Sequence, residues 1–268
     1  MDSLGAVLGP LAAFILLPWV GGNLRWIFFL SFIPALAAVL IIFLFVREVE
    51  RDTSRSRETA KRDSQGIRAL EPEFRYFVVV VCFFTLGNSS DAFLVLRAKD
   101  LGVPVVTIPL LWLFFNGINT IFSVPGGMLS DRVGRRQVIF WSFLFYGLVY
   151  LGFALALRPL HVWFLFALYG VYYGFSEGVL RAYVADLVPS HLRGTAYGIF
   201  HTASGTMAFP ASLIMGILWH RLGASWAFVF GAVLAFLSAI LLLRLPRKPD
   251  TKGSQEESAS PSPPPINP

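Results

Sequence analysis

Eight long runs of this 268-residue chain are uncharged or nearly so, and they constrain its fold more than any other feature. Their approximate limits are 3–20, 26–46, 76–96, 105–128, 137–157, 162–180, 195–219 and 225–243. Each run is long enough to cross the roughly 30 Å apolar core of a bilayer as a helix that rises about 1.5 Å per residue. Because a backbone in lipid must satisfy its own hydrogen bonds, the runs predict helices. The expected fold class is all-α, a polytopic membrane protein with eight transmembrane helices.

The few charged residues indicate how the chain lies in the membrane. They make up 14% of the chain, against about 25% in a typical soluble domain. Basic residues concentrate in alternate loops, most of all in residues 47–68 between the second and third runs. Loops rich in Lys and Arg stay on the cytoplasmic side, so both termini are expected in the cytoplasm. The net charge of +6 reflects these loops and does not indicate nucleic-acid binding.

A tight, charged turn at residues 127–136 joins two of the apolar runs. It contains two glycines, one acid and three arginines, namely Gly127, Gly134, Asp131, Arg132, Arg135 and Arg136. The turn resembles the cytoplasmic loop signature of the major facilitator superfamily, Gly-x-Leu-x-Asp-Arg-x-Gly-Arg-Arg, at every fixed position. The resemblance implies a loop inside a six-helix half that holds helix ends together in one state of a transport cycle. The alternative is an anchor that only sets topology.

An internal repeat points to the same architecture. Residues 5–47, moved along by 200 positions, match residues 205–247 at seven places. The identical pairs are Gly5 and Gly205, Pro10 and Pro210, Trp19 and Trp219, Trp26 and Trp226, Phe28 and Phe228, Ala35 and Ala235, and Arg47 and Arg247. Parallel six-helix repeats build the two halves of this superfamily. We therefore expect an N-terminally truncated transporter that lacks four helices before Met1, with two unrelated hairpins as the alternative.

Shorter segments extend the resemblance over residues 1 to about 245. Gly5, Gly9 and Pro10 look like the fifth-helix motif of proton-linked exporters, although Ala13 and Phe14 replace its final glycine pair. Small residues four apart also serve ordinary helix packing. Residues 88–93, 185–189 and 193–196 resemble the seventh helix and the tenth-to-eleventh helix region of bacterial facilitator proteins. The resemblance implies proton-linked antiport that exports small organic compounds across the plasma (bacterial inner) membrane.

The same architecture divides the chain into four parts. Residues 1–46 are expected to form the closing helical hairpin of the N-terminal half, and residues 47–73 the cytoplasmic linker between the halves. Residues 74–245 are expected to form the complete six-helix C-terminal half. Residues 246–268, which contain seven prolines, are expected to be a disordered cytoplasmic tail.

Polar residues inside the runs predict the transport pathway, because a polar group that faces lipid is costly. Helical spacing groups them on four runs, as Asn88 with Asp91, Asn116 with Asn119, Tyr173 with Glu177, and His201 with Ser204. The third, fourth, sixth and seventh runs are therefore expected to line a cavity. The fifth and eighth runs carry fewer polar residues and are expected to face lipid.

The roles of these residues remain open at the level of sequence. Glu177 is a proton carrier or, one turn from Arg181, half of a gate pair. Asp91 serves proton coupling, gating or helix capping. The asparagines bind substrate or hold helices together, and His201 is a cavity-wall residue or a proton relay. Arg181, Asp186 and Arg193 flank the link between the sixth and seventh runs, so we group them with the signature turn as gate residues.

No enzyme site is evident in the sequence. It contains no phosphate-binding loop ending in Lys-Ser or Lys-Thr and no His/Cys cluster with metal spacing, so we expect no cofactor and no metal. The expected partners are a small-molecule substrate, protons, the lipid bilayer and a missing N-terminal half. With eight of twelve expected helices, the chain is not expected to transport alone. The second hypothesis is a non-transporting membrane interaction protein, or a half-transporter that needs a separate N-terminal partner.

Overall fold

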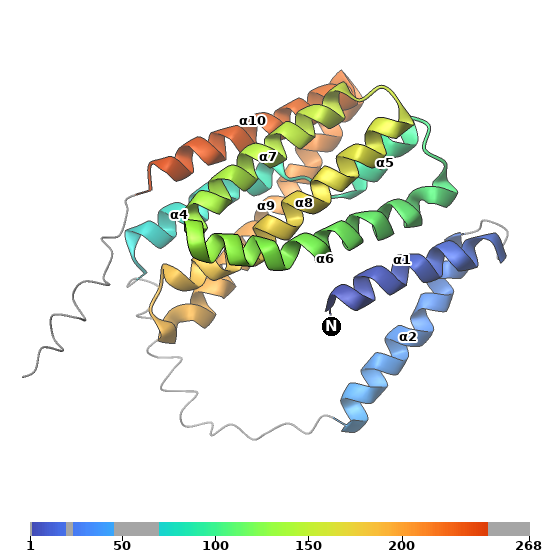
Figure 1. The fold of residues 1–268 in the computed structure, drawn as a ribbon, viewed down its shortest axis with the longest axis horizontal. Coiled ribbons are helices and arrows are strands. Elements are labelled where there is room, and N and C mark those ends of the chain that lie inside the picture. Colours follow the sequence, from blue (N-terminus) through green and yellow to red (C-terminus); the bar gives the residue numbers. More distant parts are fainter. Residues whose placement is uncertain (1, 20–23, 46–69, 246–268) are drawn as a thin grey trace, which may run out of the picture.

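The computed structural model describes residues 2–19, 24–45 and 70–245, and every regular element within them is a helix (Figure 1). The α-helices are α1 (Asp2–Trp19), α2 (Leu24–Phe45), α4 (Pro72–Gly87), α5 (Ala92–Asp100), α6 (Ile108–Val133), α7 (Arg135–Leu155), α8 (Pro159–Asp186), α9 (Arg193–Leu222) and α10 (Ala224–Leu243), with 3-10 turns η1 (Val105–Thr107) and η2 (Ser190–Leu192). The eight runs thus become eight helices, if α4 and α5 count as one interrupted helix, and the all-α class is confirmed. Most of the predicted linker and the predicted tail lie outside the described residues.

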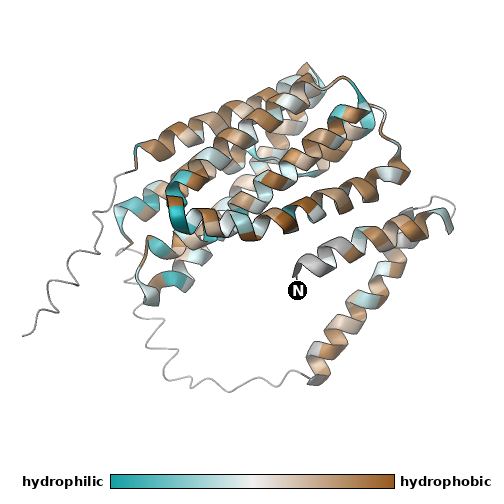
Figure 2. Cartoon of the chain, in the orientation of Figure 1, coloured by the Kyte–Doolittle hydropathy of each residue, from teal (hydrophilic) through white to brown (hydrophobic). Residues whose placement is uncertain are grey.

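Five helical stretches are long and apolar enough to cross a membrane, by length and composition. They are Pro72–Asp100, Val105–Val133, Arg135–Leu155, Ser190–Leu222 and Ala224–Leu243. Helix α8 has 28 residues but carries Glu177, Arg181 and Asp186 in its last third. Hydrophobic residues make up most of each helix, while strongly hydrophilic residues gather at helix ends, among them the turn between α6 and α7 (Figure 2). Many large apolar side chains of these helices are exposed, such as Trp141, Phe164 and Phe209. An apolar outer surface is what a lipid environment requires.

Single glycines make the two tightest connections. Gly134 alone separates α6 from α7, with φ of 103°, and Gly223 alone separates α9 from α10, with φ of 94°. L side chains rarely adopt this region of backbone space, whereas glycine does so at little cost. The second glycine of the signature turn therefore has a backbone role, because it lets the chain reverse within one residue.

Helices α4 to α10 form one bundle around aromatic side chains. Helix α7 packs against α8 and α10, α10 also packs against α4 and α9, and α6 lies against α8. In the centre, the Phe84 ring stacks on that of Phe143 with centroids 4.0 Å apart, and the Phe153 ring stacks on that of Phe228 at 5.5 Å. The hairpin of α1 and α2 lies beside this body, with α1 against α6 (Figure 1).

Glycines allow the closest helix approaches. A Cβ built on Gly126 of α6 would lie 2.7 Å from the carbonyl oxygen of Gly174 in α8. A Cβ built on Gly87 of α4 would lie 2.9 Å from the carbonyl oxygen of Gly231 in α10. Real Cβ atoms essentially never come within 3.0 Å of another atom. Both crossings therefore depend on small residues, as is common where membrane helices meet.

The glycines of α1 make no such close helix approach among the described residues. A Cβ built on Gly5 or Gly9 would meet no described atom within 4 Å, and Pro10 is only partly buried. Their role as a packing motif therefore stays a prediction. The described parts of residues 5–45 and 205–245 each form two consecutive helices, which is compatible with the predicted repeat.

Candidate functional site

The third predicted span is interrupted inside the bundle. Helix α4 ends at Gly87 and α5 begins at Ala92, so residues 88–91 are not helical. The prediction that Asn88 and Asp91 share one helix face is therefore wrong. The sequence Asn-Ser-Ser-Asp explains the break, since short polar side chains offer the backbone alternative hydrogen bonds. Here the backbone N–H of Ala92 donates to Ser90 Oγ at 3.3 Å.

Tyrosines from two neighbouring helices hold the polar residues of this break. The hydroxyl of Tyr169, on α8, donates to Asp91 Oδ1 at 2.7 Å. The hydroxyl of Tyr146, on α7, lies 3.2 Å from Asn88 Oδ1 and 3.3 Å from the carbonyl oxygen of Gly87. Asp91 and Asn88 are each partly buried, while both tyrosines are fully buried. The break is thus a partly buried polar segment in contact with two buried tyrosines.

Sequence reasoning missed the contribution of α7. It treated the fifth run as lipid-facing, whereas Ser142, Tyr146 and Tyr150 all lie buried within the bundle. The hydroxyl of Tyr150 and Ser89 Oγ are buried without a hydrogen-bond partner in the part of the chain that the structure describes. The signal was present in the sequence, because tyrosines four residues apart occur on both α7 and α8.

A small polar cleft lies between α6 and α8. It has a volume of about 90 Å³ and is lined by Asn119, Ser123, Gly127, Tyr173, Gly174, Glu177, Gly178 and Val179. This volume would hold about three water molecules at roughly 30 Å³ each. Glu177 is paired with Arg181 one turn further along α8, as predicted from their spacing, and both side chains are about half exposed. Three of the residues predicted for the pathway, Asn119 from α6 and Tyr173 and Glu177 from α8, thus line one cleft.

Besides Asn88 and Asp91 at the helix break, two further predicted pathway residues do not line this cleft. The side-chain amide of Asn116 donates to the carbonyl oxygen of Trp112 at 2.9 Å, within its own helix. His201 is exposed on α9, with its ring 5.2 Å from that of Phe200. Roles for Asn116 and His201 in binding or proton transfer stay predictions.

The signature turn connects the ends of four helices. Arg135 Nη1 donates to Asp186 Oδ1 at 2.6 Å and to the carbonyl oxygen of Ala182 at 2.8 Å, both on α8. Arg135 Nη2 also lies 3.6 Å from Asp131 Oδ1. Arg136 Nη2 donates to the carbonyl oxygens of Leu242 and Leu243, at 2.9 and 2.8 Å, where α10 ends. Cations placed there complement the negative ends of the helix dipoles.

The other residues grouped with the turn lie differently. Arg132 is exposed, and so is Arg193 at the first position of α9. Gly127 lines the polar cleft. Arg181 pairs with Glu177, and its carbonyl oxygen accepts from the Tyr197 hydroxyl at 3.1 Å. Among the described residues, no group of three or more His, Cys, Asp or Glu side chains is placed to hold a metal ion.

Comparison with known proteins identifies the family. The model of the Major Facilitator Superfamily matches residues 1–212 and, in a second match, residues 121–267. The chain belongs to the major facilitator superfamily. It is thus a multi-pass membrane protein of a transporter family, in agreement with the expectation that it is not an enzyme.

Several individual proteins are similar to this chain. An uncharacterized MFS-type transporter of Methanocaldococcus jannaschii is 34% identical over 248 residues, which cover 90% of this chain and 61% of the relative. The probable galactarate/D-glucarate transporter GudP of Escherichia coli is 28% identical, over 66% of this chain and 42% of its own length. The quinolone resistance protein NorA of Staphylococcus aureus is 28% identical, over 68% of this chain and 47% of its own length. The chain therefore spans about three fifths or less of the length of these relatives.

Proposed function

We propose that the protein is a secondary active transporter that exports small organic compounds in exchange for protons. The observation that carries this proposal is the Asp91 carboxyl group, which lies at a helix break inside the bundle and accepts a hydrogen bond from Tyr169. Ionisable groups within membrane helices are rare, and they mark ion pathways in transporters. Interrupted helices are also a common way to build ion and substrate sites near the middle of the membrane.

The direction of transport and the substrate class are part of the proposal. Two relatives bear names that differ in this respect, a quinolone resistance protein and a transporter of galactarate and D-glucarate. Export is supported by the likeness of Gly5, Gly9 and Pro10 to the exporter motif. We further propose that the protein lies in the bacterial inner membrane with both termini in the cytoplasm. This orientation places the arginines of the signature turn on the cytoplasmic side.

Flux in membrane vesicles tests this proposal. The protein is expressed at its full encoded length, and uptake of a fluorescent quinolone into everted vesicles is measured at several imposed pH gradients. An acidic vesicle interior is expected to drive accumulation, and Asp91→Asn or Glu177→Gln is expected to remove the dependence on the gradient. Asp100→Asn is the matched control, because that carboxylate is exposed at the end of α5.

Two results of these flux measurements would contradict parts of the proposal. Wild-type gradient dependence that survives in both Asp91→Asn and Glu177→Gln would contradict proton coupling through either acid. Uptake of D-glucarate into right-side-out vesicles, with no quinolone flux in everted ones, would contradict export and favour an importer of sugar acids.

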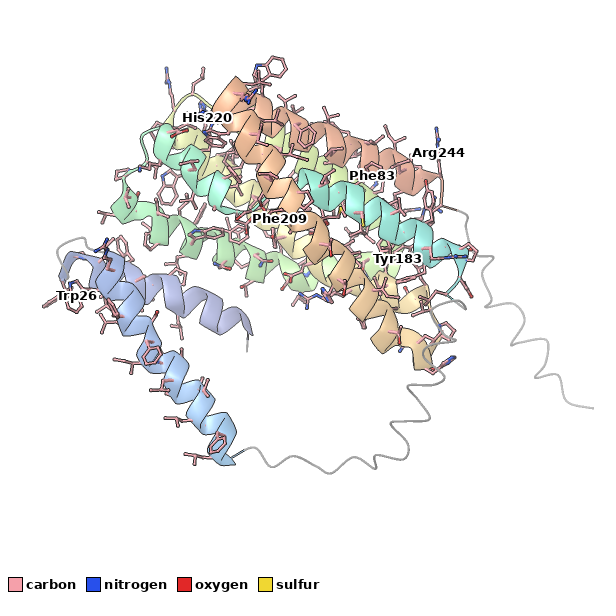
Figure 3. All side chains as sticks on the ribbon, turned by 180° about the vertical axis from the view of Figure 1, so that it is seen from behind. Trp26, Phe83, Tyr183, Phe209, His220 and Arg244 are labelled. Carbon is pink, nitrogen blue, oxygen red and sulfur yellow. The ribbon has the colours of Figure 1, made fainter. Side chains whose placement is uncertain are left out.

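A second candidate is a non-transporting interaction protein, or a half-transporter that needs a separate N-terminal partner. The exposed apolar face of α9 favours it, since Phe209 is 75% exposed and Ile217 is 50% exposed. Figure 3 shows the part of α9 that carries Phe209 without a covering helix among the described residues. Alternating access requires two halves around one site. Flux by the reconstituted 268-residue chain alone would contradict this candidate.

A further inference from the structure

Three polar side chains form a line along one face of α8. Tyr169, Tyr173 and Glu177 follow one another at intervals of four residues, so they lie on the same side of the helix. The line extends about 12 Å along the helix axis. One end meets Asp91 of the helix break and the other ends at the Glu177–Arg181 pair. The line therefore connects the only two acids within the eight apolar runs.

Contacts join the members of this line. The Tyr169 hydroxyl donates to Asp91 Oδ1 at 2.7 Å. The ring of Tyr173 stands nearly perpendicular to that of Tyr169, at an interplanar angle of 69° and a centroid distance of 5.2 Å. Tyr173 and Glu177 line the same polar cleft of about 90 Å³, which is large enough for water to bridge their polar atoms.

We propose that Tyr169 and Tyr173, together with water in this cleft, carry protons between Asp91 and Glu177. This inference rests on the proposed function, and it names the route by which that transporter would move its coupling ion. In this proposal, Asp91 and Glu177 act as the two ends of one pathway through the C-terminal bundle.

Each step of the transfer balances without a co-reactant. Protonated Asp91 gives its proton to the Tyr169 oxygen, while the Tyr169 hydroxyl proton passes to the oxygen of Tyr173 or of a water. That group in turn releases a proton toward Glu177. Every O–H bond that breaks is replaced by one that forms, so the net result is one proton moved from Asp91 to Glu177. Protonated Glu177 no longer attracts Arg181 as an ion pair, which opens that contact.

The surroundings of both acids are consistent with a single route. Around the break, the titratable side chains are tyrosines of α7 and α8, namely Tyr146, Tyr150, Tyr169, Tyr172 and Tyr173. Helix α10 contributes no titratable residue, and α9 contributes Ser212, whose Oγ accepts from the Ser90 N–H at 3.4 Å. Around Glu177, α6 contributes Asn119 and Ser123, and α8 contributes Arg181.

Hydrogen–deuterium exchange at the Asp91 carboxyl tests the route without requiring transport. The purified chain is placed in lipid nanodiscs at a pH at which Asp91 is protonated, and the buffer is switched rapidly to D2O. Infrared spectroscopy follows the shift of the carboxyl C=O band, which the Asp91→Asn variant assigns. We expect Tyr173→Phe and Tyr169→Phe to slow the exchange by about 100-fold, the lower end of what a positioned proton-transfer group contributes.

Tyr172→Phe is the matched control, because Tyr172 is buried on the same helix between the two proposed residues. In the Tyr172→Phe variant, the Asp91 carboxyl is expected to exchange its proton at the wild-type rate. Tyr173→Phe is the decisive variant, since Tyr173 makes no hydrogen bond to Asp91 and its loss leaves the Tyr169 contact in place. Equal exchange rates in Tyr173→Phe, Tyr172→Phe and the wild type would overturn the proposal.

A flux measurement separates this inference from the proposed function. In the transporter at its full encoded length, Tyr173→Phe is expected to reduce flux driven by a pH gradient by a much larger factor than it reduces substrate exchange at equal pH. If flux through the wild-type protein does not depend on the pH gradient, the proposed function is contradicted. The exchange rates of the Asp91 carboxyl would still decide whether the proton route exists. Loss of both kinds of flux in Tyr173→Phe would contradict a role limited to protons.

Discussion

Adding one methyl group at Gly126 should loosen the contact between α6 and α8. A Cβ there would meet three backbone atoms, at 2.7 Å from Gly174 O, 2.9 Å from Phe175 Cα and 3.3 Å from Gly174 C. Backbone atoms cannot rotate away as a flexible side chain would. To restore an ordinary contact of 3.4 Å, the two helices must separate by about 0.7 Å, and a gap of that size forfeits a quarter to a half of the dispersion energy of neighbouring contacts.

The neighbouring Gly127 supplies a matched control. A Cβ built on Gly127 meets nothing within 4 Å, although it lies in the same helix one residue further on. Both Gly126→Ala and Gly127→Ala gain about 1 kcal/mol of helix propensity, so this gain cancels when the variants are compared. Overpacking costs about 1–3 kcal/mol. We therefore expect Gly126→Ala to be less stable than Gly127→Ala by about 2 kcal/mol, or about 30-fold in the folding equilibrium constant.

The measurement is reversible unfolding by sodium dodecyl sulfate in mixed micelles, followed by circular dichroism. A second pair on the facing helix repeats the comparison. A Cβ on Gly174 would lie 2.8 Å from Phe122 Cβ and 2.9 Å from Phe122 C, whereas a Cβ on Gly178 meets nothing within 4 Å. If Gly126→Ala unfolds at the same detergent fraction as Gly127→Ala, the described α6–α8 crossing is wrong.

Two contacts at the helix ends give further expectations. Asp186→Asn should lower the free energy of unfolding by about 1 kcal/mol, and Asp131→Asn should lower it by less than about 0.5 kcal/mol. The reason is that Arg135 lies 2.6 Å from Asp186 but 3.6 Å from the more exposed Asp131. Equal effects of the two variants in thermal unfolding at low salt would refute this ranking. Arg97→Lys should destabilise the protein by about 1–2 kcal/mol, since the guanidinium group donates to the carbonyl oxygens of Phe153, Ala154 and Ala156 at 3.1, 3.4 and 3.0 Å. Arg158→Lys, an exposed control, should be neutral in the same unfolding assay, and a similar loss in both variants would speak against the contact.

The sequence predicts the helices well because membrane helices are encoded locally. Uncharged runs place all eight, and the four-residue spacing of Glu177 and Arg181 predicts their ion pair. The sequence also predicts that the signature turn lies at helix ends, since a charged segment between two apolar runs is expected to leave the membrane. These features depend only on composition and on spacing within one helix.

Features that depend on contacts between helices cannot be predicted from the sequence pattern of a single helix. A periodic pattern places Asn88 and Asp91 on one face, but the competing hydrogen bonds of four short polar residues interrupt the helix there. The inward direction of Tyr146 depends on how α7 is rotated against α4 and α8, which no local pattern specifies. The preference of Arg135 for Asp186 over Asp131 likewise depends on where α8 ends in space.

The single-residue link at Gly134 has a mechanical consequence. One residue leaves α6 and α7 almost no freedom to slide past each other at this end, and Arg135 and Arg136 fasten the same point to α8 and α10. We therefore expect any relative tilt of α6 and α7 to displace most the helix ends that lie farthest from this turn. For a helix of 26 residues, such as α6, the length is about 39 Å, so a tilt of about 10° would displace the far end by about 7 Å. A short, charged turn can thus amplify a small local rearrangement into a displacement of several ångströms at the opposite end of the helix.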